Sequence, residues 1–376
     1  MPKRSKTSTR PPLRLTDSEI APPREVAEQP VQTSEAADNA RAAISVSRRR
    51  RMLGFALAVG ALATCILLSF TIGSQQLSIE QIVAALQGAD SEAWTIIRDL
   101  RGPRTALGIL VGAALGIAGA LMQAFTRNPL ADPGILGVNA GAAFAVAAGA
   151  AAFGITTLSG TIWFALLGAV ATTFAVWAIG ASGRRGVDPL RITLAGVAIG
   201  AFLSGITSGI TLLLPEVFDR MRGWNAGSIA STPSAQIGWV LPFLLVGFVL
   251  AFAVARPLNA VALGDDLAVS LGSRIVRTRV LAIIAATLLC AAATAVAGPI
   301  GFVGLMVPHA VRWFTGPDQR WIFAGSLIAA PVLVLASDIV GRVVLRSGEL
   351  PVGIVTAFVG APVLIMLVRR RGASAL

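Results

Sequence analysis

The sequence is poor in charge, and it contains no tyrosine, one histidine and two cysteines. Of its 376 residues only 13% are Asp, Glu, Lys or Arg, whereas 55% are hydrophobic and the mean hydropathy is +0.75. A soluble globular protein carries about 25% charged residues. The shortage excludes a water-soluble globular fold for most of the chain. It predicts an all-α, polytopic helical membrane protein.

The missing residue types also exclude several kinds of catalytic and metal site. No lysine follows Lys6, so the chain has no GxxxxGK[ST] loop for ATP. A single histidine, His309, excludes an HExxH site, a bis-histidine haem site and a Cys2His2 zinc site. Cys65 and Cys290 lie inside apolar runs, where packing residues are expected rather than a disulfide or a metal pair. We therefore expect no catalytic, cofactor-binding or metal-binding residue; a membrane enzyme with His309 as its base is the alternative of that class.

Positive charge is concentrated at the N-terminus. Residues 1–51 hold 11 of the 31 Lys and Arg residues. The first ~45 residues mix Pro, Ser, Thr, Glu and Arg without periodicity, which is typical of disorder. We expect a disordered cytoplasmic tail over 1–50, a membrane domain over 51–371 and a short C-terminal tail over 372–376. The net charge of +12 suggests nucleic-acid binding, but most other cations flank apolar runs, where membrane topology explains them, and we expect no nucleic-acid partner.

Ten apolar runs are candidates to cross ~30 Å of hydrocarbon. The eighth is too short for an ordinary span and would work only as a helix packed inside the protein. The cluster Arg48–Arg51 before the first run places the N-terminus in the cytoplasm, and ten crossings return the C-terminus there; 17 arginines then lie inside and 7 outside. The runs are 52–72, 104–125, 134–154, 158–181, 190–214, 237–256, 279–298, 300–314, 322–345 and 351–368.

Glycines recur every four residues in several of these runs. Small residues on one helix face let two backbones approach closely in lipid, where no hydrophobic effect drives association. We expect each of them to serve tight helix packing. The glycines are Gly108, Gly112 and Gly116, then Gly137 with Gly141 and Gly205 with Gly209.

Charged residues also stand at predicted outside ends of the runs. Arg101 and Arg104 would sit at a helix N-terminus, where two positive charges oppose the helix dipole. A docked acidic partner would stabilise them, and exposure to solvent or lipid headgroups is the alternative. Asp338 and Arg342 are four residues apart at the end of a span, so we expect them to lie together on one helix face.

Two predicted inside stretches interrupt the apolar pattern. Residues 123–137 contain two prolines and two glycines, which indicate a tight turn with Asn128 and Asp132 as caps. Residues 263–279 (LGDDLAVSLGSRIVRTR) indicate a short amphipathic helix, a turn and a second helix. Such an element packs on a cytoplasmic partner or lies on the membrane surface, and the residues alone leave both alternatives open.

At these stretches the sequence resembles the binding-protein-dependent ABC permeases for iron–siderophore complexes, haem and vitamin B12, the FecCD/BtuC-type family. The resemblance covers nearly all of residues 52–370 and excludes the tail. Several long motifs in the right order carry it: RGPRTALGILVGAALGIAGALMQAFTRNPLADPGILGVNAGA (101–142), RGWNAGSI (222–229), GDDLAVSLG (264–272), GPIGFVGLMVPHAVR (298–312) and SDIVGRVVLRSGELPVGIVTAFVGAPV (337–363).

The resemblance implies a ten-helix permease of a type II ABC importer in the bacterial cytoplasmic membrane. It works as a homo- or heterodimer with two cytoplasmic ATPase subunits and an extracytoplasmic solute-binding protein. In the family, a loop like 264–279 forms the coupling helices that seat in the ATPase; the matching residues are Gly264, Asp265, Asp266, Leu267, Ala268, Leu271, Gly272 and Arg274.

The resemblance also implies two further sites. Outside arginines of the family dock acidic groups of the binding protein, and the matching positions are Arg101, Arg104 and Arg342. A helix similar to 190–214 lines the translocation pathway at the dimer axis. Its hydroxyls would let a polar chelate slide, or they bond to their own helix carbonyls: Ser204, Thr207, Ser208 and Thr211.

The function expected from this resemblance is transport of an iron(III)–siderophore complex, with ATP hydrolysed by a partner subunit. A vitamin B12 or haem permease of the same architecture is the alternative within the family. A secondary transporter or channel working alone is the alternative of another class. From Pro133 to Gly183 no charged residue occurs, which argues against ion coupling along an intramembrane chain of acids.

Overall fold

A computed structural model describes residues 33–73, 77–88, 91–182, 188–230, 233–345 and 348–370. The chain divides into two units, Met1–Val46 and Ser47–Leu376. In the first unit, the described part is the beginning of helix α1 (Thr33–Thr71). The tail expected over 1–50 thus lies mostly outside the described residues, and helix α1 begins well before the predicted span at 52. Residues 372–376 also lie outside them.

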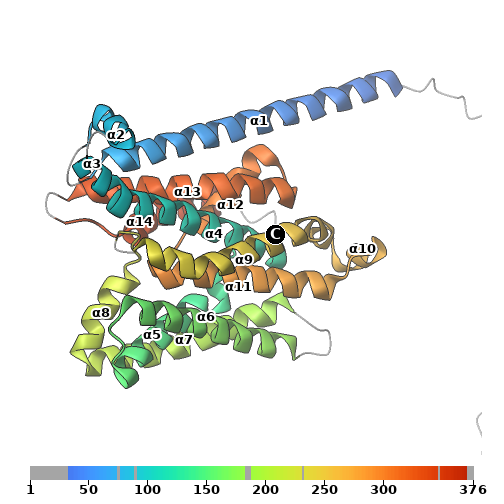
Figure 1. The fold of residues 1–376 in the computed structure, drawn as a ribbon. Coiled ribbons are helices and arrows are strands. Elements are labelled where there is room, and N and C mark those ends of the chain that lie inside the picture. The colour runs from blue at the N-terminus through green and yellow to red at the C-terminus, as the bar shows by residue number, and fades with distance from the viewer. Residues whose placement is uncertain are drawn as a thin grey trace, which may run out of the picture. The chain divides into compact units, whose positions relative to one another are not determined.

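The described residues form helices and connecting turns, as Figure 1 shows for the second unit. Each of the ten apolar runs lies on a helix. By length and composition, seven helices of the described residues are able to cross a membrane, and α5 and the apolar part of α14 are shorter. The ten helices are α1, α4 (Gly102–Thr126), α5 (Val138–Phe153), α6 (Leu158–Ala181), α7 (Pro189–Leu213), α9 (Ser234–Ala262), α11 (Ile275–Ala297), α12 (Val303–Thr315), α13 (Gln319–Val344) and α14 (Val352–Arg370).

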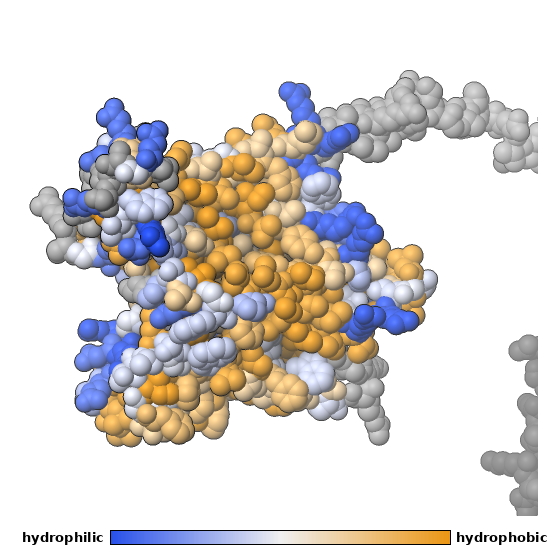
Figure 2. All heavy atoms as spheres, viewed as in Figure 1, coloured by the Kyte–Doolittle hydropathy of each residue, from blue (hydrophilic) through white to orange (hydrophobic). Residues whose placement is uncertain are grey.

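Among the described residues, six short elements lie between these helices. The sequence predicted α10 and the capped turn at Asp132 that contains η2, but not the other four. Helices α2, α3 and α8 lie at one end of the bundle and α10 at the other (Figure 1). Figure 2 shows apolar side chains over the middle of the visible face and polar side chains at both ends, as expected for a membrane-crossing bundle. The elements are α2 (Ile79–Leu86), α3 (Ser91–Thr95), the π-helical turn η1 (Ile96–Arg101), the 3-10 turn η2 (Pro133–Leu136), α8 (Pro215–Asn225) and α10 (Asp265–Ser270).

Helices α4 and α11 form the centre of the bundle. In their most apolar stretches 83% and 78% of the residues are buried, against 11% for α7. Helix α4 is rich in alanine and glycine and helix α11 in alanine, so neighbouring backbones can pack closely around them. The short helix α12 packs inside the protein: most of its side chains, including Pro308 and His309, are buried. The prediction of a short internal helix is therefore confirmed.

The regularly spaced glycines divide into two groups. A Cβ on Gly112 would lie 2.7 Å from the backbone of Pro331, and one on Gly116 would clash with Ala330, so α4 and α13 are in backbone contact there. Gly108 and Gly141 also face neighbouring helices closely. The packing prediction is confirmed for these positions. It is wrong for Gly205 and Gly209 within this chain, because no atom of the described residues lies within 4 Å of a Cβ built on either.

Candidate functional site

The arginines predicted for docking belong to a buried cluster at the α8 end of the bundle. The Arg104 guanidinium donates to both carboxylate oxygens of Asp338, with Nε–Oδ1 and Nε–Oδ2 distances of 3.1 and 3.0 Å and an Nη2–Oδ1 distance of 2.8 Å. Its Nη2 also lies 2.7 Å from Glu349 Oε2. Asp338 is 1% exposed, so its charge depends on these partners.

The other two arginines form hydrogen bonds between this cluster and the end of helix α1. Arg342 pairs with Asp338, as the four-residue spacing predicts, and donates to the carbonyl oxygens of Ser69 and Ile72 at 2.9 Å. Arg101 is buried and donates to the carbonyl oxygen of Phe70. Helices α1, α4 and α13 thus meet through charge-assisted hydrogen bonds.

The expectation that Arg101 and Arg104 oppose a helix dipole is wrong. Helix α3, turn η1 and helix α4 follow one another without a break from Ser91 to Thr126, so neither arginine is at a free helix N-terminus. For Arg104, acidic partners are present inside the chain, as Asp338 and Glu349, whereas Arg101 donates to the Phe70 carbonyl. Two arginines at the same end of the bundle are exposed: Arg98 in turn η1 and Arg222 on α8.

At the opposite end, helix α10 is held on its acidic side. Asp265 accepts hydrogen bonds from Arg279 at 3.0 and 3.1 Å and pairs with Arg127. The sequence places Gly264 before α10 and Gly272 after it, with φ of +117° and +76°, values that L side chains rarely adopt. The predicted order of short helix, turn and second helix is confirmed, with α11 as the second helix.

The other side of α10 is apolar and uncovered within the described chain. Leu267, Val269 and Leu271 are 56%, 62% and 66% exposed, while Ala268 is fully buried against the bundle. Asp266 and Arg274 are also exposed. Exposed leucines on a helix tied to the bundle by ion pairs form a surface suited to a protein partner or to the membrane interface.

The four hydroxyls predicted for the pathway separate into two pairs on α7. Thr207 and Thr211 donate to carbonyl oxygens one turn back in the helix, at 2.8 and 3.0 Å. The hydroxyl groups of Ser204 and Ser208 lie on the exposed side of the helix. The back-bonding alternative therefore describes both threonines, and the serines are the hydroxyls that a passing molecule could contact.

Ser204 also lines a cavity of about 400 Å³ beside the N-terminal part of α5. Asn139 and Asn225 line the same cavity with glycines of η2 and α7, so neutral polar groups converge there. Asn139 accepts a hydrogen bond from Thr294 at 3.0 Å. Sequence reasoning missed both asparagines; their signal was an uncharged amide at the edge of an apolar run.

Among the described residues, no group of three or more His, Cys, Asp or Glu side chains is arranged to hold a metal ion. Cys65 and Cys290 are buried and free, and His309 is buried on α12. The candidate site therefore offers a surface at α10, a hollow on α7 and a charge cluster at the α8 end. These features suit conformational coupling and passage of a solute.

Comparisons with known proteins agree with this arrangement. The model of the FecCD transport family matches residues 61–370. The chain is 48% identical to the ferric enterobactin transport system permease protein FepD of Escherichia coli over 305 residues, covering 81% of this chain and 91% of that protein. It is 37% identical to the cobalamin import system permease protein BtuC of Halobacterium salinarum over 290 residues, covering 77% of each.

A solved structure gives the same result for the fold. It is an inward-facing metal-chelate type ABC transporter that superposes with a TM-score of 0.76 at 27% identity, covering 85% of this chain and 99% of that one. All ten apolar runs of this chain lie on helices, and the family match extends over nine of them and part of the first. This chain belongs to the FecCD transport family.

Proposed function

We propose that the chain is the membrane-spanning permease subunit of a binding-protein-dependent ABC importer that carries a ferric siderophore. Family membership and the 48% identity to a ferric enterobactin permease support the transport class and the cargo. The observation in the structure that carries the proposal is the exposed apolar surface of helix α10 and the residue after it, Leu267, Val269 and Leu271, at one end of the bundle. ATP hydrolysis belongs to a separate partner.

Coupling in this proposal runs through residues 264–279. Closure of the ATPases on ATP would push on Leu267 and Leu271, and the ion pairs of Asp265 with Arg127 and Arg279 would pass the displacement to α4 and α11. Because α4 and α11 are the central helices, a shift at their α10 ends changes the bundle as a whole. The α10 end is then cytoplasmic, and so are both termini.

The translocation pathway is proposed along the exposed side of α7. Its Ser204 and Ser208 are exposed, and Ser204 lines the hollow with Asn139 and Asn225. The open space beside Gly205 and Gly209 leaves room for a second permease subunit, identical or homologous, to face this side. Neutral hydroxyl and amide groups would contact a polar chelate without binding it tightly.

Docking of the solute-binding protein is proposed at the α8 end. Arg101, Arg104 and Arg342 were expected to contact it, but their side chains are largely buried in contacts within the chain. Arg104 reaches the exposed Glu349 and has the most access of the three. We add Arg98 and Arg222, because an exposed arginine is free to meet an acidic side chain.

The test is uptake of an iron-labelled siderophore by cells that express the chain with its ATPase and binding protein. Leu267→Gln should abolish most uptake at normal permease level, because it removes an apolar contact with the ATPase. The matched control is Trp313→Gln, which changes an exposed apolar residue on α12. Equal uptake by the two variants would remove the coupling role of α10. Uptake that persists without the ATPase and collapses with an ionophore would indicate a secondary transporter instead.

Import of cobalamin is the second candidate, favoured by the 37% identity to a halobacterial cobalamin permease. Haem is a further cargo of this architecture. Competition experiments distinguish the three cargoes. Unlabelled ferric siderophore should suppress uptake of the labelled siderophore, whereas cobalamin or haem should leave that uptake unchanged. The reverse order of competition would reassign the cargo and leave the permease role intact.

A further inference from the structure

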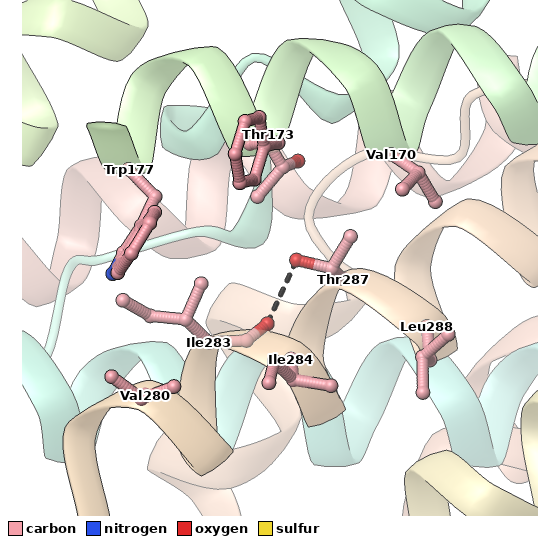
Figure 3. A pocket seen from close by; sticks show the side chains of 9 residues that line it. Val170, Thr173, Trp177, Val280, Ile283, Ile284, Thr287 and Leu288 are labelled. Atoms are coloured by element: carbon pink, nitrogen blue, oxygen red, sulfur yellow. Dashed lines mark hydrogen bonds between the residues drawn. The ribbon is translucent and has the colours of Figure 1, made fainter. Parts of the chain in front are cut away.

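A groove between helices α6 and α11 has no role in the proposed transport function. Its volume is about 310 Å³ and nine residues from the two helices line it. Figure 3 shows Thr173 and Trp177 of α6 facing Ile283 and Thr287 of α11, with Trp177 at the same end as Val280. The Thr287 hydroxyl donates to the carbonyl of Ile283 at 2.7 Å, which leaves the groove wall apolar.

The groove is open to the side of the bundle. On its rim Phe174 is 65% exposed and Ile284 is 41% exposed. Thr173 is 3% exposed, and its hydroxyl has no hydrogen-bond partner among the described residues. The indole nitrogen of Trp177 is likewise buried and has no such partner there. An unpaired indole donor at one end of an apolar groove suits a ligand with a long hydrocarbon part and a polar end.

The groove continues along α11 to a set of arginines. Val280 lines both the groove and a neighbouring cavity of about 710 Å³ near the start of α11, which Arg274 and Arg277 also line. Arg277 precedes Val280, Ile284 and Leu288 by three, seven and eleven residues, so the four side chains follow one face of the helix. Within the described chain, Arg277 is exposed and makes no ion pair.

The length of this face matches one leaflet of a bilayer. From Arg277 to Leu288 the helix rises about 16 Å at 1.5 Å per residue, close to half of a ~30 Å hydrocarbon core. The groups along this face follow the order of groups in a phospholipid. The guanidinium lies at the depth of the phosphate, the tryptophan at the depth of the esters and the apolar groove at the depth of an acyl chain.

We propose that this groove binds one acyl chain of an anionic phospholipid whose phosphate contacts Arg277, in the leaflet on the α10 side. The indole of Trp177 lies at the depth of the ester groups, and Arg274 remains one of the residues expected to contact the ATPase. Arg279 forms an ion pair with Asp265, so it is assigned to the coupling loop and not to the lipid. The cavity at Arg277 is also lined by Asp265 and Val269 of α10, so the headgroup would lie beside the surface proposed for the ATPase. Arg277 is assigned to the lipid because its side chain continues the helix face that lines the groove.

The proposal is tested on the full chain purified in a neutral detergent, with native mass spectrometry to count bound lipid. The probes are phosphatidylglycerol and phosphatidylcholine with identical acyl chains. Phosphatidylglycerol should bind more tightly. Arg277→Gln should weaken binding of phosphatidylglycerol about fivefold, as expected for one arginine at a lipid surface. It should weaken phosphatidylcholine less, because the choline cation offsets the charge of that lipid's phosphate. Arg222→Gln, an exposed arginine at the opposite end, is the charge control.

A second variant tests the acyl-chain part. Ile284→Trp fills the groove from its exposed rim and should lower the affinity for both lipids. Val249→Trp is its control, because Val249 is 68% exposed on α9 and does not line the groove. An unfolding temperature equal to that of the unchanged chain shows that each variant is folded.

Four results would overturn the proposal. The first is equal affinity for the two lipids with no effect of Arg277→Gln. The second is inorganic phosphate that displaces the lipid while Ile284→Trp has no effect, which would leave a simple anion site. The third is an Arg277→Gln variant that loses ATPase association but keeps its lipid preference. The fourth is loss of the permease dimer in Ile284→Trp with lipid binding unchanged, which would assign the groove to a second subunit. None of these measurements requires transport activity.

Discussion

Arg104 on α4 donates hydrogen bonds to both carboxylate oxygens of Asp338 on α13, a residue 234 positions later in the chain. Arg342 completes the arrangement from one turn further along α13 and reaches the end of α1. The residues that resemble a docking site for a binding protein thus also hold three helices together. A buried carboxylate between two guanidinium groups is stable only while both remain.

We therefore predict that Asp338→Asn destabilises the α8 end of the bundle. The change leaves Arg342 with less compensation for its buried charge, and loss of one partner of a buried ion pair costs about 3 kcal/mol. Unfolding in detergent, followed by tryptophan fluorescence, measures the change. Asp219→Asn, an exposed acid on α8, is the control and should leave the midpoint unchanged. Equal midpoints for both variants would show that the cluster does not stabilise the fold.

Charge reversal separates docking from folding. Arg98→Glu with Arg222→Glu should weaken association with the solute-binding protein at low salt, because both arginines are exposed, and should leave the unfolding midpoint unchanged. Arg104→Glu should lower that midpoint, since it places a second acid beside Asp338. An unchanged affinity for the binding protein in the double variant would rule out Arg98 and Arg222 as docking residues.

The glycines of α4 and α7 should respond in opposite ways to alanine. Gly112→Ala places a methyl group 2.7 Å from Pro331, and such overpacking costs about 1–3 kcal/mol. A methyl group at Gly209→Ala meets no atom of another described segment within 4 Å, so the stability of the monomer should be unchanged. In the assembled permease, the same variant should weaken the dimer, measured by its sedimentation. A dimer that withstands Gly209→Ala would move the subunit interface away from this side of α7.

The start of α13 should lose stability in acid. Burial alone would raise the pKa of Asp318, but hydrogen bonds from Arg320 and Asn259 outweigh it and hold the pKa below its ordinary value of 3.8. A lowered pKa means that the stabilisation is present above pH 3.8 and is lost as pH falls through the lower value in the folded state. The unfolding temperature measured at about pH 6 and about pH 3 tests this.

The matched variant for that experiment is Asp318→Asn. In the unchanged chain the Arg320 backbone N–H donates to Asp318 Oδ1 at 3.0 Å. The amide oxygen of the asparagine can still accept that hydrogen bond, but the amide has no charge that titrates. The variant should lose less stability between the two pH values than the unchanged chain does. An identical loss would assign the acid sensitivity to other carboxylates.

Helix α10 should depend on Asp265 for its position. Asp265→Asn weakens the contacts with Arg127 and Arg279 at the surface of the bundle, so the stability of the fold should change by less than about 1 kcal/mol. Transport should fall more than stability, because a loosely held α10 transmits less displacement. Unfolding in detergent and uptake of labelled siderophore, measured on the same variant, compare the two effects. Full uptake would show that Leu267 and Leu271 suffice for coupling without these ion pairs.

Much of the fold follows from local patterns. The apolar runs predict the ten helices that contain them, because an apolar segment in lipid must satisfy its backbone hydrogen bonds internally. The glycines around α10 and the cap at Asp132, which accepts from Gly134 at 2.8 Å, are also visible in the sequence. Helices α2, α3 and α8 were missed, because they are short, mixed in composition and formed at the end of the bundle.

The sequence by itself determined the class of the protein, most of its helices, the short helix α10 and the pairing of Asp338 with Arg342. Only the tertiary structure decided that Arg104 pairs with Asp338, that Gly112 packs while Gly209 does not, and that Arg277 continues an apolar groove. The reason is physical. Helix formation depends on neighbours in the chain, whereas a charge pair, a close backbone contact or a groove depends on which distant helices meet.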